Sequence, residues 1–147
     1  MNSAHLPTIR VVAGALFDDQ GRVLIAQRPP GTHMAGRWEF PGGKIHSGET
    51  ELQALTRELA EELGVQLVSA ERLLELTHDY TERRVMLSMW TVTAFQGVPS
   101  SLDGQALKWV RPAELAVEDL LEADRPIVAA LTARAAAATS DSRRRIS

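Results

Sequence analysis

The chain has 147 residues, of which 44% are apolar and 24% charged, and this composition suits one globular domain with a hydrophobic core. Its 16 basic and 19 acidic residues give a net charge of −3, which argues against general binding to nucleic acid, and no apolar run is long enough to span a membrane. The sequence has no cysteine and no stretch typical of a signal peptide. We therefore expect a cytoplasmic protein, one domain over residues 1–147, with no membrane, nucleic-acid polymer or obligate protein partner.

The first part of the chain predicts two strands that form a hairpin. Residues 8–17 and 23–27 are rich in β-forming side chains, and a turn sequence occupies residues 18–21 between them. Prolines and glycines predict a loop over residues 28–37, and a short strand is expected at residues 38–40.

A sharply bounded helix is predicted between Thr50 and Gly64. Thr50 is a good N-cap, and Gln53 three residues later completes a capping box, while Gly64 stands where a left-handed C-terminal cap falls. Leucines recur at helical spacing and predict the face that packs on a core. They are Leu52, Leu55, Leu59 and Leu63.

The second half of the chain alternates strands with loops and closes with a helix. Residues 85–95 form the clearest strand, because β-branched, aromatic and methionine residues are dense there. Strands that flank a central helix, with a second helix at the end, predict an α/β (α+β) fold in which helices cover both faces of a mixed sheet. The other predictions are a strand with a break at 67–77, a connection at 79–83, a loop at 96–104, a strand at 106–110, a helical turn at 112–115, a helix at 126–138, and flexible ends at 1–7 and 139–147.

Three glutamates lie close together on the predicted central helix. Glu58, Glu61 and Glu62 occupy positions i, i+3 and i+4, so they share one arc near the helix C-terminus, where the helix dipole disfavours negative charge. A cation would offset their repulsion, and oxygen ligands suit a hard ion such as Mg²⁺, which usually keeps several waters and bridges to phosphate. The same three residues also fit a solvated acidic surface.

The wider spacing favours the metal site. Residues 43–65 fit the pattern G-x5-E-x7-R-E-U-x-E-E-x-G-U, where U is a bulky aliphatic residue, at every fixed position. This pattern is the Nudix box, so the chain resembles the Nudix hydrolases, which adopt an α/β/α sandwich with a mixed sheet. The matched residues are Gly43, Glu49, Arg57, Glu58, Leu59, Glu61, Glu62, Gly64 and Val65.

The resemblance implies hydrolysis of a phosphoanhydride with Mg²⁺ as the cofactor and Mn²⁺ as a substitute. Glu58, Glu61 and Glu62 would bind the metal together with the main-chain carbonyl of Gly42, and Glu58 is also a candidate for the base that accepts a proton from water. Asp103, on a predicted loop, would supply a fourth acidic group, or would be a simple turn aspartate.

Other residues of this region have supporting roles by resemblance. Glu49 and Arg57 would form an ion pair that braces the loop against the helix, which is a structural role. Lys44 would contact phosphate or help to position the water, and the alternative is an exposed lysine without such a role. Gly43 would let the backbone approach a phosphate more closely than a Cβ allows.

Residues 28–45 extend the resemblance to the MutT-like branch of the family. His-Met-Ala and Glu-Phe-Pro-Gly-Gly-Lys-Ile in this stretch are similar to 8-oxo-dGTP diphosphatases, which cleanse the nucleotide pool and release pyrophosphate and a nucleoside monophosphate. By this resemblance Arg28 would contact phosphate or sugar, and Phe40 would line the base pocket or belong to the core. Arg83 or Tyr80 would lie near the nucleoside triphosphate substrate.

Asp124 departs from the MutT-like pattern, which has an asparagine there whose amide reads the purine edge. An ionised aspartate only accepts hydrogen bonds, so it favours a base edge with donors, such as cytosine N4 or the N1–H and amine of guanine. The related CTP pyrophosphohydrolases act on oxidised or methylated cytosine nucleotides, carry an aspartate there, and resemble this chain through residues 104–110. N-capping of the helix before Pro126 is the structural alternative.

A third interpretation is a binding module with a Nudix fold and no catalysis. Such modules typically lose one or more of the box carboxylates, and this chain has all of them. We therefore expect an enzyme that hydrolyses 8-oxo-dGTP or a similar oxidised nucleotide, with CTP or a modified dCTP as the alternative substrate.

Overall fold

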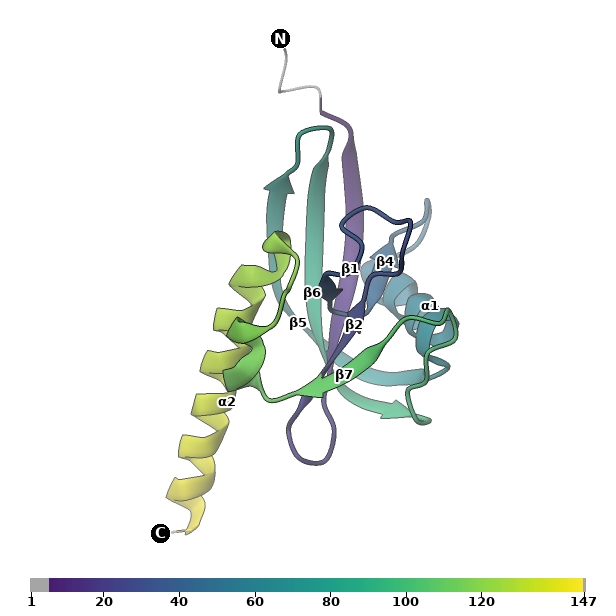
Figure 1. Ribbon diagram of the computed structural model, residues 1–147. Helices are drawn as coiled ribbons and strands as arrows, with labels where there is room; N and C mark the ends of the chain where they lie inside the picture. Colours follow the sequence, from purple (N-terminus) through teal and green to yellow (C-terminus); the bar gives the residue numbers. More distant parts are fainter. Residues whose placement is uncertain (1–5, 147) are drawn as a thin grey trace.

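The computed structural model describes the backbone of residues 6–146 and the side chains of residues 6–137. The strands form the middle of the molecule, one helix lies at their side, and a long helix closes the sequence on the other side (Figure 1). The elements are β1 (Thr8–Leu16), β2 (Val23–Gln27), β3 (Trp38–Glu39), β4 (Gly42–Lys44), α1 (Glu51–Leu63), β5 (Gln66–Asp79), β6 (Arg84–Gln96), β7 (Leu107–Val110), the 3₁₀ helices η2 (Pro112–Val117) and η3 (Glu122–Asp124), and α2 (Arg125–Ile146).

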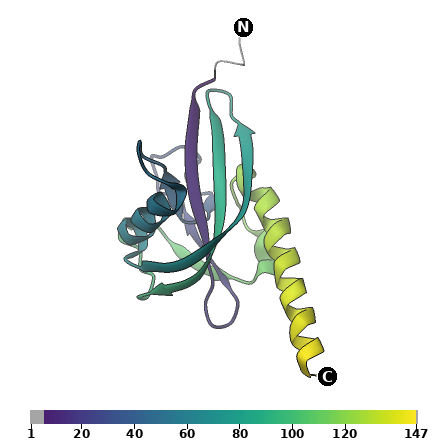
Figure 2. The same cartoon turned by 180° about the vertical axis from the view of Figure 1, so that it is seen from behind.

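Two sheets form the centre of the fold. The first has the strand order β4-β1-β6-β5, in which β1 and β6 are parallel and the other neighbours antiparallel. The second has the order β3-β2-β7 and is antiparallel. Helices α1 and α2 lie on opposite sides of the first sheet (Figure 1, Figure 2). The predicted mixed sheet between helices is therefore confirmed.

Each face of the first sheet has its own hydrophobic core. Side chains alternate along a strand, so even-numbered residues of β1 and β6, such as Val12 and Val92, pack against the leucines of α1. Odd-numbered residues, such as Ala13 and Met89, pack against α2 and the second sheet. Nearer the start of β1 and β6, odd-numbered side chains such as Val85 line a cavity.

The predicted hairpin of residues 8–17 and 23–27 is wrong. Strands β1 and β2 belong to different sheets, and only an isolated bridge between Phe17 and Val23 joins them. The turn itself is as predicted, since Asp18 accepts hydrogen bonds from the main-chain N–H groups of Gln20 and Arg22. After the turn the chain diverges, because β1 pairs along its whole length with β6 and β2 pairs with β7.

Helix α1 has the predicted caps. Thr50 and Gln53 form both hydrogen bonds of a capping box, and Gly64 adopts the left-handed conformation with φ of 69°. Leu55, Leu59 and Leu63 are fully buried, but Leu52 is 40% exposed and Ala54 is buried in its place. The buried stripe therefore runs along 54–55, 58–59 and 62–63, which turns Glu58 and Glu62 inwards.

The second half of the chain agrees with most predictions. The expected break in the strand at 67–77 corresponds to register shifts in β5, between Leu67 and Leu74. The predicted end of the last helix at residue 138 is wrong, because the backbone of α2 is helical to Ile146. No glycine or proline follows Pro126 to stop it. The predicted flexibility of residues 1–5 and 147 lies outside the described residues.

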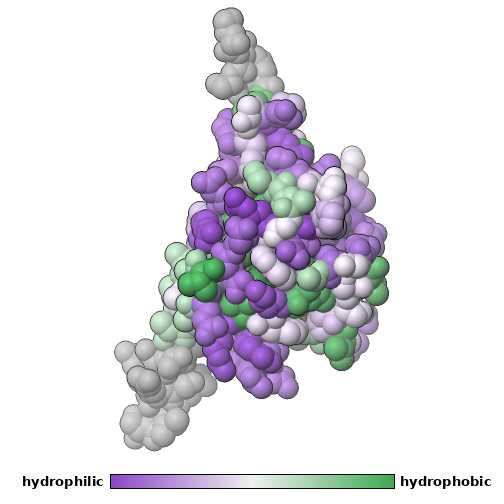
Figure 3. Space-filling model, viewed as in Figure 1, coloured by the Kyte–Doolittle hydropathy of each residue, from purple (hydrophilic) through white to green (hydrophobic). Residues whose placement is uncertain are grey.

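Hydrophilic residues cover most of the face shown in Figure 3, and the apolar patches among them are small and separate. Within the described residues, none of the helices is both long and apolar enough to cross a membrane.

Candidate active site

Arg57 joins the loop before α1 to the acidic side of the helix. Its Nε and Nη2 atoms donate to the two carboxylate oxygens of Glu49 at 2.7 and 2.9 Å, and Nη2 also donates to the main-chain oxygen of Lys44 at 3.0 Å. These hydrogen bonds stabilise the ionised carboxylate and lower the pKa of Glu49 to about 2. The ion pair expected from the sequence is present, and its geometry suits a bracing role.

The same guanidinium contacts two of the three glutamates on α1. Its Nη1 atom donates to Glu58 at 2.7 Å and to Glu61 at 3.3 Å. The side chain of Glu58 is 14% exposed, whereas that of Glu61 is 60% exposed. The structure therefore places Glu58 on the inward side of the helix and leaves Glu61 at the surface.

Glu62 packs against β4. Its Oε2 atom accepts a hydrogen bond from the main-chain N–H of Gly42 at 3.1 Å. Burial, together with the charges of Glu58 and Glu39, raises the pKa of Glu62 to about 8, while the hydrogen bond from the Gly42 N–H opposes this rise. An ionised carboxylate is unfavourable here unless a positive charge accompanies it.

Two glycines of β4 allow close approach on either side of the strand. A Cβ on Gly43 would lie 2.5 Å from the carboxyl carbon of Glu58, and one on Gly42 would lie 2.0 Å from the main-chain oxygen of Val12. Glycine at 43 therefore makes room for the carboxylate of Glu58, and glycine at 42 makes room for the neighbouring strand β1.

The loop at 96–104 returns to the C-terminal end of α1. The main-chain N–H of Leu102 donates to the main-chain oxygen of Glu62 at 3.1 Å, and that of Ser100 donates to Leu63 at the same distance. Asp103 is exposed, and its charge contributes to the raised pKa of Glu62. The predicted fourth acidic residue thus lies in the neighbourhood of the helix carboxylates.

A cavity of about 410 Å³ opens beside these glutamates. Glu62 and the strand β4 line it, and so do Phe40 and Asp124. All five residues predicted to bind substrate line this cavity, and so does Lys44. The five are Arg28, Phe40, Gly43, Arg83 and Asp124.

Arg28 is held by protein groups within the cavity. Its Nη1 atom donates to both carboxylate oxygens of Glu39, at 3.0 and 3.2 Å, and its Nε atom donates to the main-chain oxygen of His33. Arg28 therefore fixes the loop at 28–37 in addition to lining the cavity. Phe40 also has two roles, since it is 3% exposed and belongs to the core on the α2 side.

Asp124 is 5% exposed and faces the cavity. Burial, together with the charge of Glu39, raises its pKa to about 7, while a hydrogen bond from the main-chain N–H of Phe40 and the charge of Arg28 oppose this rise. The carboxylate of Asp124 therefore lines the cavity and accepts a hydrogen bond from the Phe40 N–H.

Glu39 is a cavity residue that the sequence does not predict as part of the site. It lines the cavity between Asp124 and Glu62, and burial raises its pKa against the opposing charge of Arg28. The available signal was a charged residue between two aromatic ones, Trp38 and Phe40, in a predicted strand. His33, which also lines the cavity, gave no signal beyond its place in a loop.

The acidic residues beside β4 fit a divalent cation by their chemistry. Glu58 and Glu62 are inward-facing oxygen donors that repel each other, and Asp103 adds a third negative charge. Among the described residues no three acidic or histidine side chains converge as a ready-made cage, and Arg57 instead holds Glu58 and Glu61. A cation bound by those two glutamates would replace their contacts with Arg57.

Comparison with known sequences identifies one family. A sequence model of the NUDIX domain matches residues 12–130. The CTP pyrophosphohydrolase of Escherichia coli is 39% identical over 133 residues, which cover 90% of this chain and 98% of that protein. The putative 8-oxo-dGTP diphosphatase 2 of Mycobacterium tuberculosis is 40% identical over 136 residues, which cover 92% of this chain and 96% of that protein.

Comparison with solved structures agrees as well. A structure of MutT, from work on the Aliivibrio salmonicida and Vibrio cholerae proteins, matches with a TM-score of 0.76 and 35% sequence identity, and the match covers 86% of this chain and 98% of that one. The family resemblance expected from the sequence is therefore confirmed. The chain belongs to the Nudix hydrolase family.

Proposed function

We propose that this chain is a divalent-metal-dependent nucleoside triphosphate pyrophosphohydrolase that acts on free nucleotides of the cytoplasmic pool. The observation that carries the proposal is the cavity, which joins Glu62 and the glycines of β4 to Phe40 and Asp124. Its volume, about 410 Å³, suits a small molecule, and its lining offers Lys44 and Arg83 for phosphates and Phe40 and Asp124 for a base. The names of the relatives support this class, since they act on CTP or 8-oxo-dGTP.

The reaction adds water to one phosphorus of the α–β phosphoanhydride, breaks the bridging P–O bond so that a nucleoside monophosphate and pyrophosphate separate, and transfers a proton of the water to a base. Glu58 is the candidate base, and in the metal-free protein its carboxylate accepts the 2.7 Å hydrogen bond from Arg57. Mg²⁺, or Mn²⁺ in its place, would supply charge neutralisation at the phosphates. Its proposed ligands are Glu58, Glu61, Glu62, Asp103 and the main-chain carbonyl of Gly42.

Besides Arg28, two cations among the described residues line the cavity, and they come from different elements. Lys44 comes from β4, next to the glutamates, and Arg83 comes from the turn between β5 and β6. Both side chains would bind phosphate oxygens, which compensates for the net negative charge of the protein. Arg28 already donates hydrogen bonds to Glu39, so it would have to divide its N–H groups between Glu39 and the substrate.

Asp124 would read the base, and its protonation state decides which base it suits. With a pKa of about 7, both forms of its carboxyl group are present at neutral pH. The protonated form donates and accepts, as the asparagine amide of MutT-like enzymes does, whereas the ionised form only accepts. We therefore propose 8-oxo-dGTP or a similar oxidised nucleotide as the substrate, with CTP or a modified dCTP as the second candidate favoured by ionised Asp124.

The test is kcat/KM for 8-oxo-dGTP, dGTP, CTP and 5-hydroxy-dCTP with Mg²⁺, with pyrophosphate release as the readout. A preference for 8-oxo-dGTP supports an enzyme that removes oxidised purines, and a preference for the cytosine nucleotides supports the second candidate. If none of the four releases pyrophosphate, the proposed activity is refuted, and binding of the same nucleotides without turnover would indicate a non-catalytic module.

A further inference from the structure

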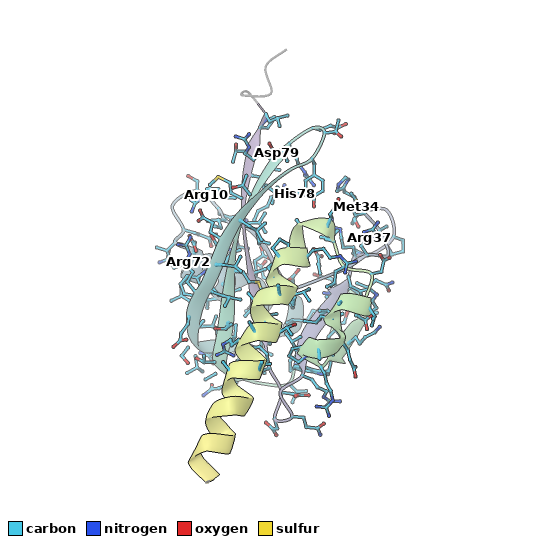
Figure 4. All side chains as sticks on the ribbon, turned by 90° about the vertical axis from the view of Figure 1, so that its left-hand side faces the viewer. Arg10, Met34, Arg37, Arg72, His78 and Asp79 are labelled. Carbon is cyan, nitrogen blue, oxygen red and sulfur yellow. The ribbon has the colours of Figure 1, made fainter. Side chains whose placement is uncertain are left out.

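The turn between β5 and β6 carries two cavity residues, Tyr80 and Arg83. One main-chain hydrogen bond closes it, from the N–H of Tyr80 to the oxygen of Arg83 at 2.8 Å. The turn lies at the free end of the first sheet, beyond α2, where His78 and Asp79 are labelled (Figure 1, Figure 4). Its position therefore depends on local contacts more than on the hydrophobic core.

An ion pair lies directly behind this turn. Asp79 and Arg84 are the last cross-strand partners of the hairpin, and the Nε and Nη2 atoms of Arg84 donate to the two carboxylate oxygens of Asp79 at 2.7 and 3.1 Å. Two parallel hydrogen bonds fix the orientation of the strand ends as well as their separation. The hydrogen bonds from Arg84 also lower the pKa of Asp79, so the pair is ionised at neutral pH.

Asp79 and Arg84 face away from the cavity. Side chains alternate along a strand, and the next residue along the chain, Val85, lines the cavity. Neither member of the pair is among the described residues that line it, and their side chains are 48% and 36% exposed. The pair can therefore affect a bound nucleotide only through the backbone of the turn.

We propose that Asp79 and Arg84 are positioning residues for substrate binding. Their ion pair holds the turn so that Tyr80 and Arg83 face the cavity. The proposal rests on the proposed function for the identity of the ligand, a nucleoside triphosphate, but not for the geometry of the turn.

The contacts of Tyr80 show why the turn must be held. Its ring meets that of His78 at the end of β5, with centroids 4.6 Å apart, and that of His33 on the loop at 28–37, with centroids 5.6 Å apart. The His33 contact joins the hairpin to the loop at 28–37, and both residues line the cavity. A loosened turn would lose this contact and would withdraw the charge of Arg83 from the phosphates.

Asp79→Asn and Arg84→Gln test the proposal. An exposed ion pair adds little to global stability, so we expect the thermal midpoint of each variant to stay within about 3 °C of the wild type. We expect KM to rise roughly fivefold while kcat stays within about twofold, because the variants weaken binding and leave the glutamates unchanged. Arg84→Lys keeps the charge but loses the paired hydrogen bonds, so it should raise KM less than Arg84→Gln.

Asp18→Asn is the matched control. Asp18 accepts a hydrogen bond from Arg22 Nε at 2.7 Å in the turn between β1 and β2, at the other end of the sheet (Figure 1). This variant should leave KM unchanged. An unchanged KM in both Asp79→Asn and Arg84→Gln, or an equal rise in Asp18→Asn, would overturn the proposal.

Amide hydrogen exchange separates this proposal from the proposed function. Exchange at residues 80–83 should be faster in Asp79→Asn than in the wild type, and unchanged in Asp18→Asn. If the wild type hydrolyses no nucleotide but exchange rises as expected, the proposed activity fails and the ion pair still positions the turn. If exchange at the turn is unchanged, the positioning role is refuted whatever the substrate.

Discussion

Replacing Glu62 by glutamine should stabilise the metal-free protein at alkaline pH while it impairs the active site. Glutamine has nearly the same shape and can still accept the hydrogen bond from Gly42, but it removes the charge that burial and neighbouring acids make unfavourable. Glu62 has a folded pKa of about 8 against an ordinary value of 4.5, so the folded wild type binds more protons than the unfolded chain between these values. Its stability therefore falls as pH rises through this window and levels off above about pH 8.

The size of the effect follows from the same shift. One pKa unit corresponds to about 1.4 kcal/mol, so the rise from 4.5 to about 8 sets an upper bound of about 5 kcal/mol on the cost of ionised Glu62. Water entry and relaxation reduce such costs, and we expect the variant to be more stable by about 2 to 3 kcal/mol above pH 8. For a chain of this length this corresponds to a rise in Tm of roughly 8 °C.

The assay is thermal unfolding in EDTA at about pH 5 and about pH 9, where Glu62 is mostly neutral and mostly ionised respectively. Glu62→Gln should match the wild type at the lower pH and exceed it at the higher one, and added Mg²⁺ should raise the Tm of the wild type more than that of the variant. Glu61→Gln is the matched control, because the exposed Glu61 should show no such dependence on pH. Equal midpoints of Glu62→Gln and the wild type at the higher pH would refute the reasoning.

Two further predictions concern the glycines of β4 and the base reader. Gly43→Ala should lower kcat by roughly 10²-fold or more with little loss of stability, because the new Cβ displaces only the flexible carboxylate of Glu58. Gly42→Ala should lower the free energy of unfolding by about 3 kcal/mol, because its Cβ meets the backbone of Val12. Equal free energies of unfolding of the two glycine variants, measured by denaturant titration, would contradict this difference. For Asp124, lowering the pH through about 7 should raise kcat/KM for 8-oxo-dGTP relative to CTP, since protonation makes the carboxyl resemble an amide. Asp124→Asn should favour 8-oxo-dGTP and abolish this pH dependence, and a ratio that still changes with pH in the variant would count against Asp124 as the base reader.

The central helix and its carboxylates could be predicted because they depend on local sequence. The caps at Thr50 and Gly64, and the positions of Glu58 and Glu62, follow from short-range spacing alone. Leu52 was placed wrongly because the inward face of a helix is set by what covers its first turn, which spacing does not show.

The pairing of strands and the position of Asp124 in the cavity depend on contacts between distant segments. The separation of β1 from β2 arises from pairing with β6 and β7, which are far along the chain. Asp124 reaches the cavity because residues 119–121 pair with β3. The Trp38 N–H donates to the main-chain oxygen of Asp119, and the Leu121 N–H donates to the main-chain oxygen of Trp38. The same tertiary burial raises the pKa of Asp124 and Glu39, so neither shift could be inferred from composition or periodicity.

The most direct test of the proposed chemistry is identification of the products from 8-oxo-dGTP and CTP with and without Mg²⁺, with Glu58→Gln beside the wild type. We expect the wild type with Mg²⁺ to yield pyrophosphate and a nucleoside monophosphate from at least one of the two, and the loss of Mg²⁺ or of the Glu58 carboxylate to lower the rate by about 10²-fold or more. Release of inorganic phosphate in place of pyrophosphate, or near-normal turnover by Glu58→Gln, would contradict the assignment of this cavity as the active site of a pyrophosphohydrolase.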